Sequence, residues 1–240
     1  PNTFKTNNLL TIKQLEKSKF NFNLKFVDAS SKGLELPEKY AGVGLARKIG
    51  IDLILPYMIS KKSLILCTDA DVTVSPNYLL TVSNYFIYNN SSAAVLGFKH
   101  RKSNIKIIDS EIQIYENYLK DTAKQLKYAG SPYSYVSMGS TMVCTVEAYC
   151  AVGGMPKRKA TEDFYFLQAL SKFDTVESIN EELIFPSSRP ISRVYLGTGF
   201  RMKQVQNGLR ISSLYFDENA FAYLAQWIAA VKSCWDLNIT

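Results

Sequence analysis

Short apolar segments alternate along the chain with longer stretches of helical periodicity. Residues 23–28, 63–68 and 93–98 are apolar runs of the length typical of buried strands. Residues 111–126 place apolar side chains on one helical face and charged side chains on the other. This alternation predicts an α/β fold, with a mainly parallel, Rossmann-like sheet that carries helices on both faces.

Further elements are predicted from caps, prolines and apolar spacing. They are a helix at 7–18, a helix over 37–60 that breaks near Pro56, a helix after Ser75 and Pro76, a strand at 140–146, a helix over 161–173 capped by Thr161, short strands at 182–185 and 192–196, and a final helix near 218–235. We expect one domain, with a catalytic core of residues 1–175 and a C-terminal extension of residues 176–240.

Two aspartates follow the apolar run at residues 63–68. Asp69 and Asp71 flank a single alanine, and a carboxylate pair at a strand end is costly to desolvate without a nearby cation. Asp28 ends the preceding apolar run in the same way. In parallel sheets ligands bind beyond the carboxyl ends of the strands, so the three carboxylates predict a ligand site at that edge.

The chain carries a formal net charge of +7, which favours anionic partners. Between residues 183 and 216 there are five basic residues and no Asp or Glu, so this region is either a solvated face or a groove for an anionic ligand. No nucleic-acid-binding module is recognisable, so we do not expect nucleic acid as the partner. His100, in a basic loop, is predicted to be solvated.

From Phe26 to about Leu170 the chain resembles family 2 glycosyltransferases of the GT-A fold. The resemblance is carried by four segments in the family's order: FVDASSKG, GVGLARKIGID, LILCTDADVTVSPNYL and the stretch from GSTMVC through GGMPKRKATEDFYF to LQAL. The family's opening strand has no counterpart in residues 1–22, so we expect that the sequence lacks an N-terminal segment.

The resemblance implies roles on the donor side of a site for a nucleotide-diphospho-sugar. Asp28 would bind the base, and Arg47 falls on the arginine of the family's Ala-Arg-Asn element. Asp69 would contact the ribose and the metal, and Asp71 would be the direct ligand of Mn²⁺ or Mg²⁺ on the diphosphate. Such a metal needs few protein ligands, because the substrate phosphates supply the rest.

On the acceptor side the resemblance implies that Asp163 is the general base and Glu162 a supporting residue. Gly139 and Ser140 would present polar groups to the sugar or the acceptor. We expect Arg189, Arg193 and Arg201, in the basic segment after residue 183, to close over the diphosphate or to hold a phosphorylated acceptor. A purely structural interpretation stays open, since acidic residues also stabilise a helix N-terminus.

The resemblance therefore implies an inverting, non-processive, metal-dependent transferase that moves a sugar, expected to be uridine-linked, to an acceptor hydroxyl. It implies a glycan or lipid-linked acceptor, a place in polysaccharide biosynthesis, and a cytoplasmic location that includes peripheral association with the inner face of the membrane. Two alternatives remain: a degenerate GT-A domain that binds a nucleotide or glycan without turnover, and a haloacid-dehalogenase-type phosphatase with Asp69 as nucleophile and Asp71 as general acid.

Overall fold

The computed structural model describes residues 2–191, 196–217 and 219–236, with the backbone alone for residues 2–5 and 236. The strands are β1 (Leu64–Leu66), β2 (Thr73–Val74), β3 (Ala93–Phe98), β4 (Met142–Thr145) and β5 (Val176–Phe185). The α-helices are α1 (Asn2–Lys17), α2 (Val43–Ile54), α3 (Tyr78–Asn89), α4 (Lys106–Tyr128), α5 (Val146–Ala151), α6 (Glu162–Phe173), α7 (Thr198–Gln206) and α8 (Ala220–Asp236). Short 3-10 helices lie at η1 (Glu38–Tyr40), η2 (Leu55–Tyr57) and η3 (Ile211–Leu214).

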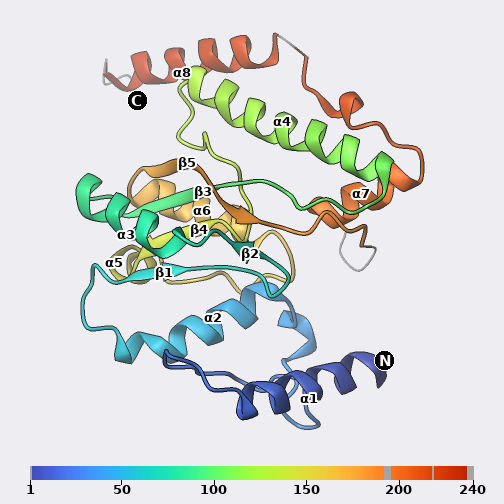
Figure 1. The fold of residues 1–240 in the computed structure, drawn as a ribbon. Helices are drawn as coiled ribbons and strands as arrows, with labels where there is room; N and C mark the ends of the chain where they lie inside the picture. Colours follow the sequence, from blue (N-terminus) through green and yellow to red (C-terminus); the bar gives the residue numbers. More distant parts are fainter. Residues whose placement is uncertain (1, 192–195, 218, 237–240) are drawn as a thin grey trace.

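The strands form a single mixed sheet in the order β1-β4-β3-β5-β2 (Figure 1). Only β3 and β5 pair in parallel, whereas β4 runs antiparallel to both β1 and β3, and β2 runs antiparallel to β5. The α/β class is confirmed, but the expectation of a mainly parallel sheet is wrong. The reason is that β4 inserts between β1 and β3, so these two strands never meet.

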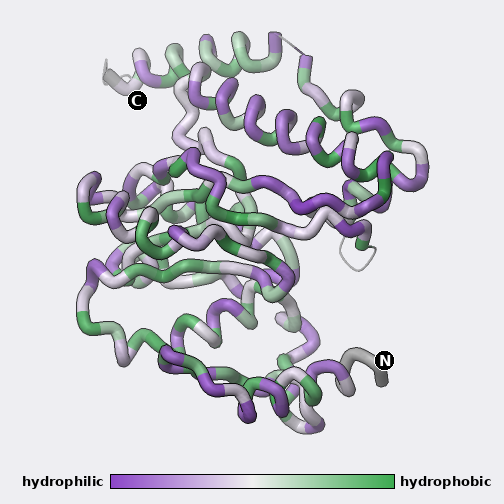
Figure 2. The backbone as a smooth tube through the Cα atoms, in the orientation of Figure 1, coloured by the Kyte–Doolittle hydropathy of each residue, from purple (hydrophilic) through white to green (hydrophobic). Residues whose placement is uncertain are grey.

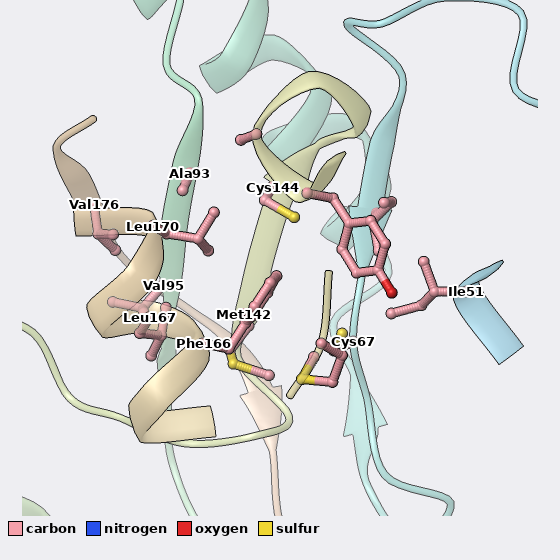
Figure 3. Close-up of a cluster of buried hydrophobic side chains, with 14 of the residues drawn as sticks. Ile51, Cys67, Ala93, Val95, Met142, Cys144, Phe166, Leu167, Leu170 and Val176 are labelled. Atoms are coloured by element: carbon pink, nitrogen blue, oxygen red, sulfur yellow. The ribbon is translucent and has the colours of Figure 1, made fainter. Parts of the chain in front are cut away.

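Helices cover both faces of the sheet, as predicted. Alternate residues of β3 point to opposite faces: Ala93 and Val95 join one buried cluster, and Ala94, Leu96 and Phe98 join another. The first cluster is completed by α2, α5 and α6 (Figure 3). The second is completed by α3. The strands at the centre of the molecule are accordingly coloured mostly hydrophobic in Figure 2.

A further layer is built from α4, α7, η3 and α8, which lies beside α4 (Figure 1). Ile108 and Ile112 of α4 pack against Met202 and Val205 of α7 in a third buried cluster. Within the described residues, no helix has both the length and the apolar composition needed to cross a membrane.

Several predicted elements are confirmed, and three predictions need correction. Residues 23–28 are irregular rather than a strand, and Phe26 and Val27 are 43% and 47% exposed, because no strand of the described ranges pairs with them. Thr161 has left-handed backbone angles and gives α6 no side-chain cap. The predicted strand at 192–196 falls mainly on residues outside the described ranges. His100 is buried rather than solvated.

Candidate active site

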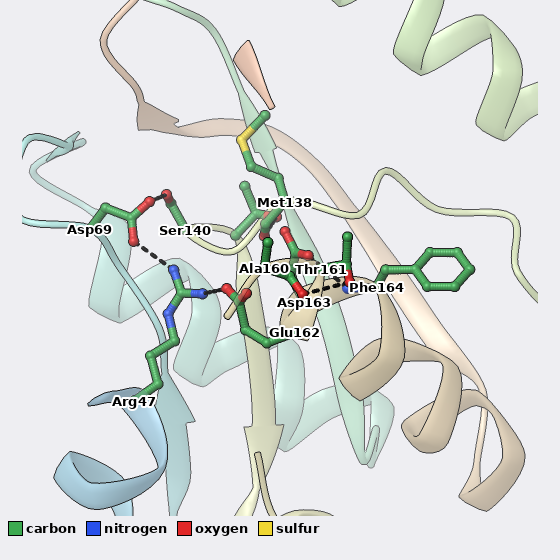
Figure 4. A network of polar contacts seen from close by, with 10 residues as sticks. Arg47, Asp69, Met138, Ser140, Ala160, Thr161, Glu162, Asp163 and Phe164 are labelled. Atoms are coloured by element: carbon green, nitrogen blue, oxygen red, sulfur yellow. Dashed lines mark hydrogen bonds and ion pairs between the residues drawn. The ribbon is translucent and has the colours of Figure 1, made fainter. Parts of the chain in front are cut away.

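Arg47 stands at the centre of a polar network that joins three distant segments (Figure 4). It lies on α2, and its Nη2 donates to Asp69 Oδ1 at 2.5 Å. Its Nη1 donates to Glu162 Oε1 at the start of α6. Asp69 Oδ2 in turn accepts a hydrogen bond from Ser140 Oγ at 2.8 Å. Four of the residues predicted for the site are thus in direct contact with one another.

The Arg47–Glu162 part of the network is shielded from water. The Arg47 and Glu162 side chains are 11% and 8% exposed, whereas that of Asp69 is 47% exposed. Burial raises the pKa of Glu162, and Asp163 and Asp69 raise it further, while Arg47 acts in the opposite direction. Arg47 therefore pairs with the desolvated carboxylate of Glu162 and with the more accessible carboxylate of Asp69.

A glycine is needed at residue 139 because the Arg47 guanidinium lies where a larger side chain would begin. A Cβ added at residue 139 would lie 2.5 Å from Arg47 Nη2 and 2.6 Å from Nη1. The guanidinium therefore packs directly against the backbone at Gly139, and any larger residue would have to displace it. This contact, together with the hydrogen bond from Ser140, brings both residues of the predicted pair into the site.

Asp71 is held by two arginines rather than by the network around Arg47. Arg189 Nη2 pairs with Asp71 Oδ2 at 2.8 Å, and Arg101 Nη2 donates to the Asp71 backbone oxygen at 2.5 Å. The Asp71 and Arg189 side chains are 40% and 62% exposed. Arg189 was expected at the diphosphate from the sequence, whereas Arg101 was not assigned, because its approach depends on the pairing of β3 with β5.

The pairing of β3 with β5 continues past the ends of both strands. Arg101 forms an isolated parallel bridge with Ser187, and Ser188 Oγ donates to the Arg101 backbone oxygen at 2.6 Å.

His100 precedes Arg101 and is buried, with Nδ1 at 2.8 Å from Glu116 Oε1 and Nε2 at 3.1 Å from Thr198 Oγ1. Burial acts to raise the pKa of Glu116, but the hydrogen bonds from His100 outweigh it and lower that pKa. This buried pair ties α4 to the start of α7.

Asp163 sits next to Glu162 in the first turn of α6. It is partly buried, and its Oδ1 accepts a hydrogen bond from Phe164 N at 2.8 Å. Figure 4 shows its carboxylate near the Arg47 network but not within it. The carboxylate is therefore positioned by the helix terminus and remains partly exposed.

Asp28 lies in the loop ahead of α2 and binds the backbone of its own turn. Its Oδ1 accepts hydrogen bonds from Ser30 N and Ser31 N, each at 3.0 Å. A hydrogen bond from the Ser31 side chain, followed by those from the Ser30 and Ser31 backbone, lowers the pKa of Asp28 to about 2. The neighbouring Ala29 and the α2 residue Ala46 line the same small cavity of about 180 Å³, so this loop rests on α2.

Among the described residues, Arg201 has no hydrogen bond or ion pair with Asp69 or Asp71. Arg201 lies on α7, where its Nη1 donates to Gln204 Oε1 at 2.8 Å. Arg193 falls outside the described residues. Within the described ranges, Arg189 is thus the member of the predicted basic segment that contacts Asp71.

The carboxylates of this site suit a hard divalent cation only if a substrate supplies most of the metal ligands. Among the described residues, no group of three or more His, Cys, Asp or Glu side chains is arranged to hold a metal. Both oxygens of Asp69 are engaged by Arg47 and Ser140, which leaves the Asp71 carboxylate as the accessible oxygen ligand. One carboxylate plus substrate phosphates is a common way of binding Mg²⁺.

Comparisons with known proteins give one similar structure. No family model matches the chain, and no curated protein matches it. A solved structure of S. aureus TarS, residues 1–349 in complex with UDP-GlcNAc, is similar with a TM-score of 0.48 and 12% sequence identity. The similarity covers 86% of this chain and 56% of that chain, so the chain spans little more than half of the TarS structure. Values this low assign the chain to no family.

Proposed function

We propose that the chain is a GT-A-type glycosyltransferase that moves a sugar from a nucleotide-diphosphate donor, expected to be uridine-linked, to an acceptor hydroxyl. The observation that carries the proposal is the chain of contacts from Ser140 through Asp69 and Arg47 to Glu162. These residues come from three of the four segments that resemble family 2 glycosyltransferases. Their contact in one corner supports treating those segments as parts of a single site.

On the donor side, the proposal uses Asp71 and the arginines around it. The exposed Arg189–Asp71 pair contributes at most about 1 kcal/mol, so Arg189 can exchange the carboxylate for a donor phosphate at little cost. Asp71, with Asp69 behind it, would then hold a divalent cation together with the diphosphate. When bound, Mn²⁺ or Mg²⁺ would offset the negative charge that develops on the departing diphosphate. Asp28 is proposed to bind the base.

On the acceptor side, Asp163 is proposed as the general base of an inverting transfer. The acceptor oxygen forms a bond to the anomeric carbon, the bond from that carbon to the diphosphate oxygen breaks, and its electron pair leaves with the diphosphate. The acceptor proton passes to the Asp163 carboxylate. Glu162, fixed by Arg47, acts as a positioning residue. Gly139 and Ser140 are proposed to contact the sugar or acceptor, and Arg193 and Arg201 stay proposals for a phosphorylated acceptor.

Asp163→Asn tests the role of the base. We expect the variant to bind donor as the wild type does and to lose transfer by roughly 100-fold or more, because an amide does not take the proton. The measurements are nucleotide-sugar binding, and UDP release from UDP-glucose, UDP-galactose and UDP-N-acetylglucosamine in the presence of a panel of acceptor sugars. Asp174→Asn, at the opposite end of α6, is the matched control.

Normal transfer by Asp163→Asn would remove the assignment of the base. Donor binding without transfer by the wild-type protein would favour a degenerate binding domain instead. The phosphatase alternative requires a free Asp69 oxygen as nucleophile, and both Asp69 oxygens are hydrogen-bonded in the structure. Metal-dependent hydrolysis of p-nitrophenyl phosphate would nevertheless favour it.

A further inference from the structure

A second pocket lies away from Asp69 and Asp71, between the C-terminal half of α4 and the segment that leads into α8. It has a volume of about 620 Å³. Asp121, Lys124, Gln125 and Tyr128 line it from α4, at spacings that place them on one helical face. Tyr215, Phe216 and Phe221 line it from the other side. The size is within the range typical of small-molecule sites.

The aromatic rings of this pocket are held in place from the core. Tyr115, which is buried in the third cluster, stacks on Tyr118 with ring centroids 6.2 Å apart. Tyr118 in turn meets Tyr215 edge-on at 5.4 Å and stacks on Phe216 at 6.2 Å. Phe216 meets Phe221 edge-on at 5.6 Å. Tyr215, Phe216 and Phe221 are therefore held on one side by these ring contacts and line the pocket on the other.

The exposure of the rings leaves apolar surface uncovered. Tyr128 is 76% exposed, Phe216 55% and Tyr215 45%. Aromatic surface of this kind is costly to leave in water and is enriched where a flat ligand stacks. The pocket thus offers ring surface on both of its walls.

Hydrogen-bonding groups stand beside the rings. Within the described residues, the Asp121 carboxylate and the Gln125 amide have no hydrogen bond or ion pair with another side chain. Asp121 and Tyr215 line the same pocket, and the Asp121 carboxylate adds to the effect of burial in raising the pKa of Tyr215. Carboxylates accept hydrogen bonds from hydroxyl groups, and an amide both donates and accepts them.

We propose that this pocket binds a neutral carbohydrate chain. A pyranose offers an apolar face of C–H groups to the Tyr128 and Phe216 rings and a rim of hydroxyl groups to Asp121 and Gln125. An anionic ligand fits poorly, because the two aspartates that line the pocket outnumber the single lysine. The choice of carbohydrate rests partly on the proposed transferase function, in which the pocket would hold a distant part of a glycan acceptor.

The test measures carbohydrate binding without any donor, so that it fails separately from the transferase assignment. The probes are cellopentaose, maltopentaose, laminaripentaose and chitopentaose, observed by saturation-transfer NMR and titration calorimetry on the full chain. We expect at least one of them to bind, and Tyr128→Ala to weaken that binding roughly tenfold through loss of one stacking surface. Asp121→Asn should weaken it as well, and Asp71→Ala should leave it unchanged.

Tyr88→Ala is the matched control, because Tyr88 is an equally exposed tyrosine on α3 and does not line the pocket. Tyr128 is itself exposed, so its replacement should leave the fold intact, as an unchanged melting temperature would show. The proposal is overturned if none of the four oligosaccharides binds, or if Tyr128→Ala binds them as the wild type does. Binding of tetramethylammonium in place of the oligosaccharides would also overturn it and identify the pocket as a site for organic cations.

Discussion

Arg47 pairs with the carboxylates of Asp69 and Glu162, which are far apart in the sequence, and the burial of each pair determines how much its loss would cost. The pair with Glu162 is buried, so loss of the arginine would leave a desolvated carboxylate without its partner. Breaking a buried pair in this way commonly costs several kcal/mol, whereas an exposed pair such as Arg189–Asp71 contributes little. We therefore assign Arg47 a structural role in addition to its proposed role at the donor.

Gly139→Ala tests this role without removing any charge. The added Cβ would displace the guanidinium, because it would lie 2.5 Å from Nη2. We expect the free energy of unfolding to fall by about 1–3 kcal/mol as Glu162 loses its partner. Urea unfolding measures the effect, and nucleotide-sugar binding should weaken in parallel.

The control for Gly139→Ala is Gly50→Ala on α2, where nothing lies within 4 Å of the added Cβ. Alanine in a helix interior should raise stability there by about 0.5–1 kcal/mol. Equal stability changes in the two variants would show that the guanidinium does not depend on the space at Gly139.

The hydrogen bonds in the Asp28 turn predict that the stability of the fold depends on pH in the acid range. The Asp28 pKa of about 2 lies below its ordinary value of 3.8, so the ionised form is favoured in the folded state. The resulting stabilisation is complete above the ordinary pKa and is lost as the pH falls through about 2. We expect the double variant Ser30→Ala, Ser31→Ala to raise the Asp28 pKa towards 3.8, as measured by NMR titration of its carboxyl carbon. An unchanged pKa would show that the hydroxyl groups do not contribute.

At the scale of elements, the parallel pair β3–β5 is what delivers the arginines to Asp71. Beyond the paired strands, Arg101 and Ser187 continue the register, and Arg189 follows two residues later. The register shifts on either side of Gly97, where the backbone of β5 comes unusually close. A Cβ at residue 97 would lie 2.3 Å from Glu181 O and 2.6 Å from Asn180 O.

Gly97→Ala should therefore destabilise the sheet, because backbone atoms rather than a flexible side chain stand in the way. We expect a loss of about 1–3 kcal/mol in the free energy of unfolding, measured by urea denaturation against Gly50→Ala. Gly97 lies within the β3–β5 pairing that positions Arg101 and Arg189, so binding of the nucleotide-sugar donor should weaken too. A stability equal to that of the wild type would mean that β5 can move aside freely.

At the scale of the whole molecule, the sequence predicted the elements better than their arrangement. Strands β1, β3 and β4 and most helices follow from apolar periodicity, which is a local property. The mixed sheet was missed because strand direction depends on which strands pair, and β4 separates β1 from β3. Residues 23–28 have a strand's composition, but a strand needs a partner, and none of the strands in the described part of the chain pairs with them.

The same distinction applies to the candidate site. Arg47, Asp69, Ser140 and Glu162 were predicted individually from a resemblance, and the fold brings them into contact. Arg189 was expected at the diphosphate, but its pairing with Asp71 was not predicted, and Arg101 was not assigned at all. A basic residue in an irregular segment has no local pattern that indicates its partner. The burial of His100 was likewise missed, since it depends on Glu116 and Thr198 from other parts of the chain.

The central claim is that Asp71 binds a nucleotide-diphospho-sugar through a shared divalent cation, and a thermal-shift panel tests it most directly. The panel compares UDP-glucose, UDP-galactose and UDP-N-acetylglucosamine, each with Mn²⁺ or with EDTA, on the wild type and on Asp71→Ala. We predict that at least one donor at about 100 times its Kd raises the wild-type Tm by roughly 5 °C with Mn²⁺, and that Asp71→Ala loses this shift. An absence of any Mn²⁺-dependent shift in the wild type, or the same shift in Asp71→Ala, would contradict the account.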